Sequence, residues 1–348
     1  MKSTEKLFDN FTATDTTAWE KAAREELQGE DPWKKLTRSY QGFSIRPLYG
    51  PNESSGIDFK LNAALESTRG ARTWYNCPRV TVNDPVEANA SALEHLQQGA
   101  DGIFFELNEP IRFAQLLRNI EWPFCALNFL VKDHENAHQE AILEHLGKQK
   151  GTTLGIWYGT STNILPSHPS FRWIGRSIAS PGTADEIAAA LESVVRQLGP
   201  SFKSRSADFG FRIEIGTDFF VEAAKLRAIR AAWQLILRRM EAPDSSLFIH
   251  ACSPAWTQEA YQPHGNMLKA TTAAMASILG GCDLLTLDAE DSTQSMMSRV
   301  ARNVSHILRE ESHFSKVADP LSGSYLVENL TQQLTEQIWS KFQANHSA

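Results

Sequence analysis

The sharpest match to a catalytic motif lies at residues 134–138, whose sequence HENAH fits the H-E-x-x-H pattern of zinc hydrolases. On a helix, His134 and His138 would lie one turn apart on one face and could bind zinc, with the glutamate as general base. The motif falls in the polar first turn of a predicted outer helix, and the nearest further ligands, Glu144 and His145, lie on that same helix. We therefore expect no metal site, and a free-standing metal-dependent hydrolase is the least favoured function.

Polar residues at or near the ends of short apolar runs form a second set of candidates. In a barrel of parallel strands, the carboxyl ends of the strands form one rim, here called the mouth, where barrel active sites lie. The mouth candidates are Asn76, Glu106, Asn128, Arg176, Glu214, His250 and Asp288. They make no recognisable catalytic set, and the plainer interpretation of each is a rim residue bonded to its neighbours. We assign no catalytic residue and no cofactor ligand from this pattern.

These candidates are positioned by an alternation of apolar runs with amphipathic helical segments. The runs, each about as long as a buried strand, are 72–77, 102–107, 123–130, 152–158, 171–179, 209–215, 246–251 and 282–288. The helical segments are 85–98, 110–119, 134–147, 183–198, 217–240, 266–279 and 293–312. Residues 159–169 are a predicted loop without a clear helix. Eight strand–helix alternations favour a (β/α)8 TIM barrel over an open doubly wound sheet.

Boundary signals agree with this assignment. Asp84 precedes a first-turn proline, residues 183–186 (TADE) form a capping box, and Gly280-Gly281 ends a helix. Residues 1–70 form an arm before the barrel, with a helix at 16–27 and a strand at 43–49. Residues 71–348 form the barrel and a closing helix at 325–342. An arm of this kind contacts another subunit, plugs a barrel end, or simply packs against the barrel.

Composition narrows the classes of function. The 348 residues include 34 Lys+Arg and 41 Asp+Glu, for a net charge of −7, and 42% are hydrophobic, which is typical of a globular protein. Without a basic cluster or an apolar run of about 18 residues, we expect no nucleic-acid partner and no membrane span. The charged N-terminus lacks a secretory signal, and four cysteines far apart predict buried thiols in a reducing cytoplasm.

The apolar runs are rich in large aromatic side chains. These include Trp74, Tyr75, Phe104, Phe105, Trp157, Tyr158, Trp173 and Phe211. About half of them should point inward, because side chains alternate along a strand. A barrel with such inward residues is filled.

Several segments of the second half carry a resemblance to a known family: residues 211–230, 249–256, 266–276, 299–304, 310–312 and 317–328. In these segments, and in their order, the chain resembles the methylmalonyl-CoA mutase family. In the first half, residues 42–49 resemble the family's entry segment, and Arg69-Gly70 is similar to the remnant of another motif. The resemblance implies a (β/α)8 barrel, which family members follow with a separate cobalamin-binding domain.

Departures from the family pattern are equally informative. Catalytic family members carry Gly-Tyr-His after the fifth strand, where residues 177–183 (SIASPGT) have neither Tyr nor His. After the seventh strand, residues 261–266 (YQPHGN) keep only the proline and the last asparagine of Gln-Asp-Pro-Tyr-Asn-Asn. The D-x-H-x-x-G motif of the cobalamin domain is absent. Small hydroxyl residues line the CoA tunnel of catalytic members, whereas these strands are aromatic. We therefore expect no cobalamin-binding domain in this chain.

These losses resemble the small, non-catalytic subunit of heterodimeric mutases. The resemblance implies a partner chain that binds adenosylcobalamin and isomerises methylmalonyl-CoA to succinyl-CoA, with this chain catalytically silent and acyl-CoA binding left open. Radical chemistry of this kind is carried by the cofactor. The alternative function is a catalytic acyl-CoA mutase barrel that uses a cobalamin domain supplied in trans. In that case Asn76, Arg176, Glu214 and His250 would have to act.

Overall fold

The computed structural model describes residues 15–51, 72–132, 134–146, 154–159, 171–253, 264–291 and 294–347. Its main sheet has nine parallel strands in the order β3-β11-β10-β9-β8-β7-β6-β5-β4. They are β3 (Tyr75–Asn76), β4 (Arg79–Val82), β5 (Gly102–Leu107), β6 (Ala126–Val131), β7 (Gly155–Tyr158), β8 (Phe171–Ile178), β9 (Phe209–Glu214), β10 (Phe248–Cys252) and β11 (Leu284–Thr286).

β3 and β4 are two halves of one strand, separated by Cys77 and Pro78. Proline has no backbone N–H and so interrupts the ladder. Pairing continues on both sides: the Cys77 N–H donates to the Leu285 carbonyl (2.9 Å), and the Phe104 N–H donates to the Pro78 carbonyl (2.9 Å). β3 pairs with β11 and β4 pairs with β5. Both ends of the sheet therefore belong to one strand, the ring closes, and the predicted (β/α)8 barrel is confirmed.

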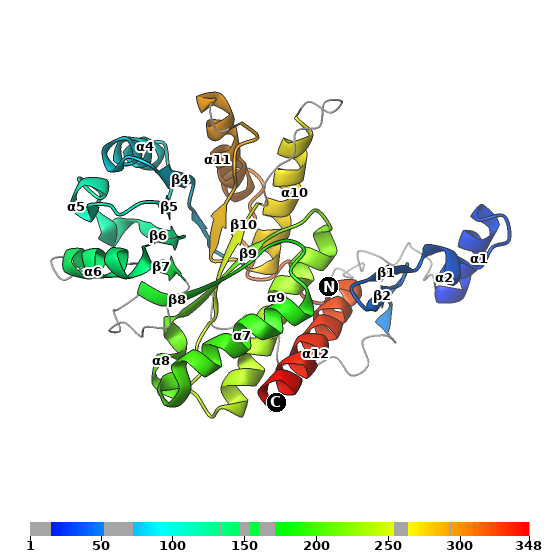
Figure 1. Cartoon of the computed structure of the whole chain (residues 1–348). Helices are drawn as coiled ribbons and strands as arrows, with labels where there is room; N and C mark the ends of the chain where they lie inside the picture. The colour runs from blue at the N-terminus through cyan, green and yellow to red at the C-terminus, as the bar shows by residue number, and fades with distance from the viewer. Residues whose placement is uncertain are drawn as a thin grey trace, which may run out of the picture.

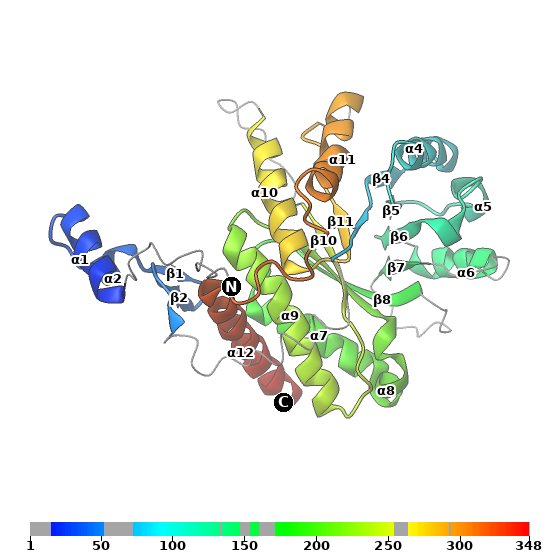
Figure 2. The same ribbon diagram turned by 180° about the vertical axis from the view of Figure 1, so that it is seen from behind.

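Helices pack around the outside of this barrel (Figures 1 and 2). They are α4 (Pro85–Gln97), α5 (Phe113–Leu116), α6 (Glu135–Leu146), α7 (Ala184–Leu198), α8 (Phe202–Arg205), α9 (Phe219–Arg239), α10 (Gly265–Gly280), α11 (Ser295–Glu310) and α12 (Tyr325–Ser347). Short 3-10 turns include η2 (Trp122–Phe124), η3 (Gly199–Ser201) and η4 (Ser206–Asp208). α12, the predicted closing helix, packs against α7 and α9.

The predicted boundary signals act as expected. Asp84 caps the N-terminus of α4, and Thr183 forms the capping box of α7 with Glu186. Gly281, at φ +93°, ends α10 in a left-handed conformation that glycine adopts without strain.

Several predicted elements differ from the structure. In the arm, the strand predicted at 43–49 forms only at Phe43–Ile45. The first apolar run was predicted to end at residue 77, but the strand resumes after Pro78 and continues to Val82. The helix predicted at 110–119 forms only at Phe113–Leu116, since Asn119 adopts a left-handed φ of +61° and the chain turns into η2. Most of the predicted loop at 159–169 lies outside the described residues.

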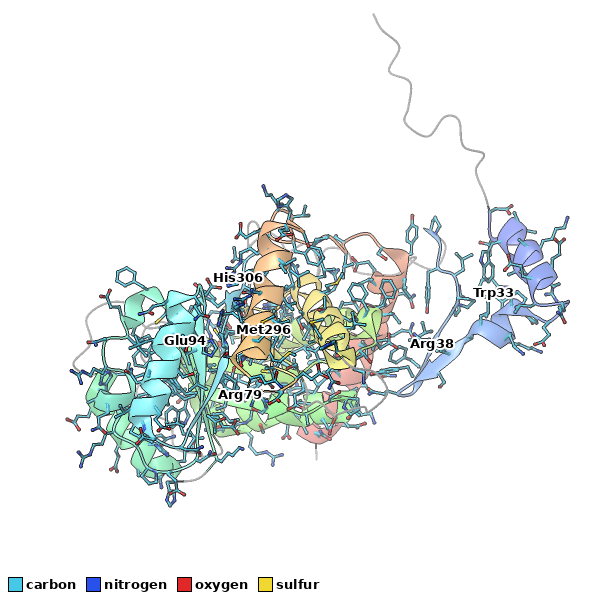
Figure 3. The ribbon with its side chains drawn as sticks, turned by 90° about the horizontal axis from the view of Figure 1, so that it is seen from above. Trp33, Arg38, Arg79, Glu94, Met296 and His306 are labelled. Atoms are coloured by element: carbon cyan, nitrogen blue, oxygen red, sulfur yellow. The ribbon has the colours of Figure 1, made fainter. Side chains whose placement is uncertain are left out.

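The described part of the arm, residues 15–51, contains α1 (Thr16–Glu26), α2 (Pro32–Leu36), β1 (Arg38–Tyr40) and β2 (Phe43–Ile45). β1 and β2 form a separate antiparallel hairpin. Figure 3 shows the two helices extending away from the barrel, with Trp33 on the outlying part and Arg38 nearer the body. Arg38 pairs with Asp218, just before α9 (3.2 Å). None of the α1 residues is buried, so this helix packs little against the barrel.

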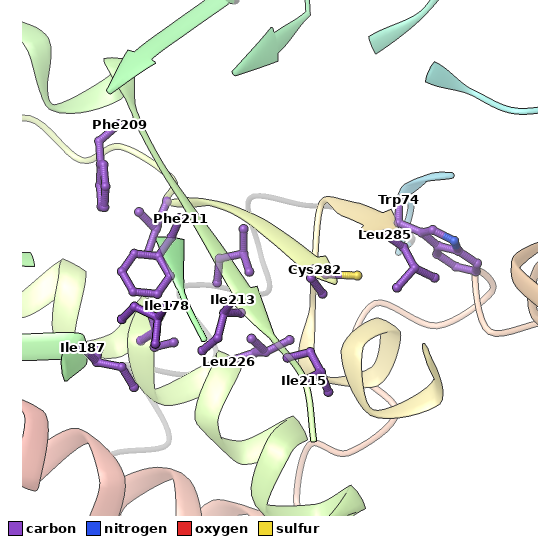
Figure 4. Packing of buried hydrophobic residues seen from close by; sticks show 14 of the residues in the cluster. Trp74, Ile178, Ile187, Phe209, Phe211, Ile213, Ile215, Leu226, Cys282 and Leu285 are labelled. Carbon is purple, nitrogen blue, oxygen red and sulfur yellow. The ribbon is translucent and has the colours of Figure 1, made fainter. Parts of the chain in front are cut away.

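The main hydrophobic core lies between the barrel strands and the surrounding helices. Figure 4 shows part of it, where Phe211 and Ile213 of β9 and Ile187 of α7 lie close to Leu226 of α9. A second, smaller apolar cluster occupies the space enclosed by the strands, here called the lumen. Its buried members are Cys77, Phe104, Ala126, Ile156, Tyr158, Phe248, Cys252 and Leu284.

A buried ionic network anchors the closing segment of the chain to the barrel. Asp319 contacts Arg227 of α9 and lies 3.9 Å from Arg72. Arg227 also binds Glu328 of α12 (2.7 Å), and the side chains of all four residues are at most 8% exposed. Arg72 also donates a hydrogen bond to the carbonyl oxygen of Leu279 (2.7 Å), at the end of α10. The network joins the start of the first strand to α9, α10 and α12.

Replacement of Asp319 by alanine should destabilise the barrel strongly. Arg227 would lose one of its two carboxylate partners while remaining buried, which typically costs about 3–5 kcal/mol in the free energy of unfolding. Urea denaturation followed by circular dichroism measures this change. Asp244→Ala, at an exposed loop position, is the matched control and should shift stability by less than about 0.5 kcal/mol. Equal midpoints for the two variants would contradict this role of Asp319.

Candidate functional site

Charged side chains at the mouth neutralise one another. The Arg79 guanidinium donates to both carboxylate oxygens of Asp288, through Nε (2.8 Å) and Nη2 (3.0 Å). Arg79 Nη1 lies 3.5 Å from Glu106, which also pairs with Lys132. Burial alone would raise the pKa of Glu106, but Lys132 and Arg79 together outweigh it and lower the pKa. Glu106 is therefore an ionised partner in a network rather than a proton donor.

Glu214, the third mouth carboxylate, is also engaged. It accepts from Arg212 Nη2 (3.3 Å) and from the Ser180 N–H (3.3 Å). Glu106, Glu214 and Asp288 are thus each paired with a cation of the same rim. A charged substrate at this rim would have to displace an existing partner.

His250 lies within the lumen below the mouth and is fully buried. Its Nδ1 is 3.0 Å from the Tyr158 hydroxyl, and its Nε2 is 2.8 Å from Thr286 Oγ1. The Thr286 hydroxyl donates its single proton to the Cys77 carbonyl (2.6 Å). It must then accept from Nε2, which assigns the proton of a neutral His250 to Nε2 and leaves Nδ1 to accept from Tyr158.

The surroundings of His250 keep the imidazole neutral. Burial, followed by the positive charges of Arg212 and Arg79, lowers the pKa of His250 well below its ordinary value. Burial likewise raises the pKa of Tyr158 and of Cys252. These groups hold one protonation state at neutral pH and are sealed from solvent. They suit structural hydrogen bonding rather than acid–base catalysis.

Aromatic rings and arginines fill the lumen. Phe104 packs edge-on against His250, with 4.8 Å between the ring centroids. The guanidinium groups of Arg79 and Arg212 lie over the Phe104 ring, at 5.2 and 5.7 Å from its centroid. Arg172 lies over Phe248 at 4.1 Å. Phe104 and Tyr158 are at most 1% exposed. A tunnel for a pantetheine arm would expose these inward side chains to water, so the described strands enclose a filled lumen.

Two of the eight aromatic residues noted in the sequence, Phe104 and Tyr158, belong to this lumen cluster. Trp74, Phe105, Trp157, Trp173 and Phe211 belong to the outer core instead. Gly175 makes room for the inward ring of Tyr158, because a Cβ at Gly175 would lie 2.3 Å from that ring. The lumen is therefore filled by a few large side chains, and the Tyr158 ring fits because residue 175 is a glycine.

Several predicted mouth residues lie elsewhere. Asn128 is buried in the lumen, where its Nδ2 donates to the Ile103 carbonyl (3.2 Å). Asn76 donates to the Arg302 carbonyl on α11 (3.1 Å). It lies near the amino end of the first strand, because that strand continues beyond Pro78 to Val82. The mouth position of this strand is taken by Arg79.

Arg176 lies on the outer face of β8. Its Nε donates to Ser193 of α7 (3.0 Å), and it also bonds Gln197. A β-bulge between β7 and β8 shifts the register and reverses the alternation along β8. Arg172 consequently lies over a lumen ring, whereas Arg176 binds a helix.

Sequence reasoning missed Arg79, Lys132 and Arg212 as mouth or lumen residues. The signals were present: residues 79–82 (RVTV) alternate polar with β-branched residues directly after Pro78. Arg212 precedes Glu214 by two positions and so shares its face of β9. Both patterns follow from strand alternation.

The H-E-x-x-H segment lies at the start of α6, and its two histidines differ in their surroundings. His138 is 1% exposed, and neither ring nitrogen has a hydrogen-bond partner among the described residues. Glu135 Oε1 accepts from Trp157 (3.2 Å) and from Gln139 (3.1 Å). Within the described ranges, no three His, Cys, Asp or Glu side chains are grouped so as to hold a metal ion. The motif's second histidine is a core residue.

Two cavities lie near the mouth. The larger, about 520 Å³, lies between α4 and α11, and its lining includes Arg79, Asp288, His95 and Arg302. The smaller, about 370 Å³, is lined by residues of β6, β7 and β8, including Tyr158. Neither lining includes His250.

The fold and site define a closed (β/α)8 barrel with a filled lumen and a self-neutralised mouth. A family model described as methylmalonyl-CoA mutase matches residues 189–347. The chain is 27% identical over 398 aligned positions to the methylmalonyl-CoA mutase small subunit of Porphyromonas gingivalis, with 98% of this chain and 64% of that protein covered. Over most of its length, this chain is similar to the methylmalonyl-CoA mutases.

Other relatives are similar over most of this chain. Identity is 26% to the methylmalonyl-CoA mutase of Cereibacter sphaeroides, covering 94% of this chain and 57% of that protein. Identity is 24% to the human mitochondrial methylmalonyl-CoA mutase, covering 91% of this chain and 53% of that protein. The chain thus spans roughly half to two-thirds of the length of these relatives.

Acid should destabilise the protein partly through His138. Burial, with a smaller contribution from His134, lowers the pKa of His138, so the unfolded chain binds a proton that the folded chain does not. This histidine's contribution to stability is present above the unfolded pKa of about 6.5 and falls as the pH drops below it. Denaturation midpoints at pH 8 and pH 5 measure the effect.

The matched variant is His138→Leu, which removes the titrating group and breaks no hydrogen bond seen among the described residues. It should reduce the loss of stability between pH 6.5 and 5 by up to about 1.4 kcal/mol per pH unit. His313→Leu, at an exposed position, is the control. An unchanged acid dependence in His138→Leu would contradict a buried neutral imidazole.

Proposed function

We propose that this chain is the non-catalytic, small-subunit-like barrel of an adenosylcobalamin-dependent methylmalonyl-CoA mutase. A partner chain would bind the cofactor and isomerise methylmalonyl-CoA to succinyl-CoA. The observation that carries the proposal is the filled lumen of the described strands, in which His250, Tyr158 and Phe104 are each at most 1% exposed. Such a barrel would supply a folded surface to the partner chain.

The similarity to a protein named as a small subunit supports the proposal. The alignment to that relative has 398 positions, whereas this chain has 348 residues, so the relative has a residue opposite a gap at 50 or more positions. The relative therefore carries segments within the aligned region that this chain lacks. No helix among the described ranges has the length and apolarity needed to cross a membrane.

The described mouth residues do not fit a bound corrin. Glu106, Glu214 and Asp288 are held by cations of the same rim, and His250 is sealed below them. Adenosylcobalamin is accordingly assigned to the partner, and no reaction step is placed on this chain. Acyl-CoA would likewise bind the partner's barrel. The four cysteines are buried thiols, which supports a cytoplasmic location for the complex.

The arm is the proposed contact with the partner. The rings of Trp19 and Trp33 pack at a tilt of 57° with 4.9 Å between their centroids, and Trp33 Nε1 donates to Glu20 (3.1 Å). Arg46 lies over both Trp33 (5.3 Å) and Tyr49 (5.4 Å). These contacts hold α1 and α2 together within the arm, although no residue of α1 is buried. Aromatic and arginine side chains are enriched where protein partners bind.

Reconstitution with the longer, cobalamin-binding mutase chain of the same organism tests the proposal. The two chains should co-purify as a heterodimer with methylmalonyl-CoA mutase turnover. This chain alone, given adenosylcobalamin and methylmalonyl-CoA, should show none. His250→Ala should leave turnover of the heterodimer unchanged, provided that circular dichroism shows a folded chain.

Two outcomes would contradict the proposal. A chain that stays monomeric beside the mutase chain would rule out the subunit role. Turnover by this chain with an isolated cobalamin domain, reduced by His250→Ala, would favour the alternative of a catalytic barrel supplied in trans.

The arm can be tested separately. Trp33→Ala should weaken binding of the mutase chain by about tenfold or more, because it removes the central ring of the arm cluster. Phe124→Ala, at an 83% exposed position on η2 of the barrel, is the matched aromatic control. Binding measured by calorimetry should be unchanged in the control, and equal affinities for both variants would exclude the arm as the contact.

A further inference from the structure

The larger cavity, of about 520 Å³, lies between α4 and α11. It lies where the first strand changes partners: before Pro78 the strand pairs with β11, and beyond Pro78 it pairs with β5. The Arg79–Asp288 ion pair links β4 to the segment after β11, and both residues line the cavity. Figure 3 looks onto this region, with Glu94 marking α4 and His306 marking α11. The cavity thus results from the way in which the barrel closes.

Arg302 of α11 is a buried cation in the lining of this cavity, and it is 5% exposed. Its Nη1 donates to His95 Nδ1 (3.0 Å) and its Nη2 donates to the Gln98 side chain, and neither partner carries a negative charge. Its Nε has no hydrogen-bond partner among the described residues. Burial lowers the pKa of Arg302, and Glu94, which opposes this effect, lies beyond ion-pair distance. Arg302 is therefore buried without a carboxylate partner in the described part of the chain.

Other buried arginines of the barrel do have carboxylate partners. Arg227 binds Asp319, and Arg230 binds Asp283. A buried cation is costly unless it is paired. An anion that entered the cavity beside Arg302 would supply such a partner, so the cavity favours a negatively charged ligand.

The side chains near Arg302 offer hydrogen-bond donors. Arginine has no acceptor, so His95 Nδ1 accepts from Arg302, and a neutral His95 carries its proton on Nε2. Burial, followed by the charge of Arg302, lowers the pKa of His95 and keeps the ring neutral. Ser298 lies one turn before Arg302, and Ser91 lies one turn before His95. His95 Nε2 and both hydroxyls line the cavity without a hydrogen-bond partner among the described residues, and can donate to an oxyanion.

The carboxylates of the lining do not neutralise Arg302. Asp288 is held by Arg79 through two hydrogen bonds (2.8 and 3.0 Å). Asp84 caps the first turn of α4 and accepts from backbone N–H groups there. Glu87, in that first turn, lies about 12 Å along the helix axis from the turn that bonds Arg302. The end of the cavity at Arg302 therefore keeps a positive charge.

We propose that this cavity binds a small organic acid. The acidic group, a carboxylate or a phosphate, accepts hydrogen bonds from Arg302 and His95 and pairs with the guanidinium charge. The apolar part of the ligand lies against Val80, Leu287 and Ala301, which line the same cavity. The volume of about 520 Å³ is within the range of roughly 300–1,000 Å³ that is typical of small-molecule sites. An inorganic ion alone would leave the apolar part of the lining without a contact.

Calorimetric titration of the full chain tests the site with pentanoate, butyl phosphate and the neutral isostere pentanamide. At least one of the two anions should bind at a single saturable site. Pentanamide should bind about tenfold more weakly or less, because it cannot pair with the Arg302 charge. The tighter of the two anions identifies the ligand class as carboxylic acids or phosphate monoesters. Pentanamide binding as tightly as the anions, or no saturable binding of either anion, would overturn the proposal.

Two substitutions on α11 locate the bound anion. Arg302→Gln should weaken its binding by about tenfold or more, because the cation is removed. Arg299→Gln, at an exposed position outside the lining, is the control and should leave the dissociation constant unchanged. Circular dichroism checks that both variants are folded. Equal constants for the two variants would contradict the proposal. The titrations use this chain alone, so their outcome is independent of the reconstitution with a mutase chain.

A stability measurement tests the unpaired charge without any ligand. Ser91→Glu introduces a carboxylate into the lining, and Ser91→Gln introduces a side chain of the same length without charge and with similar helix propensity. The new carboxylate should pair with Arg302, so Ser91→Glu should have the higher midpoint of urea denaturation. Equal midpoints, or a lower midpoint for Ser91→Glu, would show that the cavity does not favour an anion.

Discussion

The first strand of the barrel is shared between two neighbours, and the rest of the structure depends on this sharing. Its first half, β3, pairs with the last strand, and its second half, β4, pairs with the next strand in sequence. Only two residue pairs join β3 to β11. Side chains of α11 reinforce this seam: Arg309 binds Asp101 (2.8 Å), and Trp74 Nε1 donates to Ser305 (2.8 Å). Closure creates both the lumen and the mouth.

A closed lumen imposes strict conditions on what fills it. Inward groups cannot reach water, so each polar group must find a partner inside or be costly. His250 meets this condition through Tyr158 and Thr286, whose hydroxyl is in turn fixed by the Cys77 carbonyl of the first strand. The last of these hydrogen bonds, from Thr286 of the last strand to Cys77 of the first, crosses the seam. A substrate tunnel would have to break them.

Much of the fold is predictable from the sequence because strand and helix periodicity is local. β5 matches its predicted run residue for residue, and the capping signals of α4 and α7 fall where expected. The errors arise where tertiary contacts decide. Pro78 interrupts a strand that the sheet then restores on both sides, so the predicted run stopped too early. Asn76 was placed at the mouth for this reason.

The site was harder to predict than the fold. Its residue types were found in part, since Glu106, Glu214 and Asp288 do lie at the mouth. Their partners depend on pairs far apart in sequence, such as Arg79 with Asp288, which no local pattern shows. The bulge at β8 reversed the direction of Arg176, because a single register shift exchanges the two faces of a strand.

The seam also sets an order of events during synthesis. The hydroxyl of Thr286 bonds the carbonyl of Cys77 across 209 residues of sequence, and the ionic network at Asp319 lies later still. Contacts of such long range form late in folding. The arm leaves the ribosome long before the last strand exists, whereas the barrel cannot close until that strand has been made. A nascent chain can therefore present its arm to another protein while its own barrel is still open.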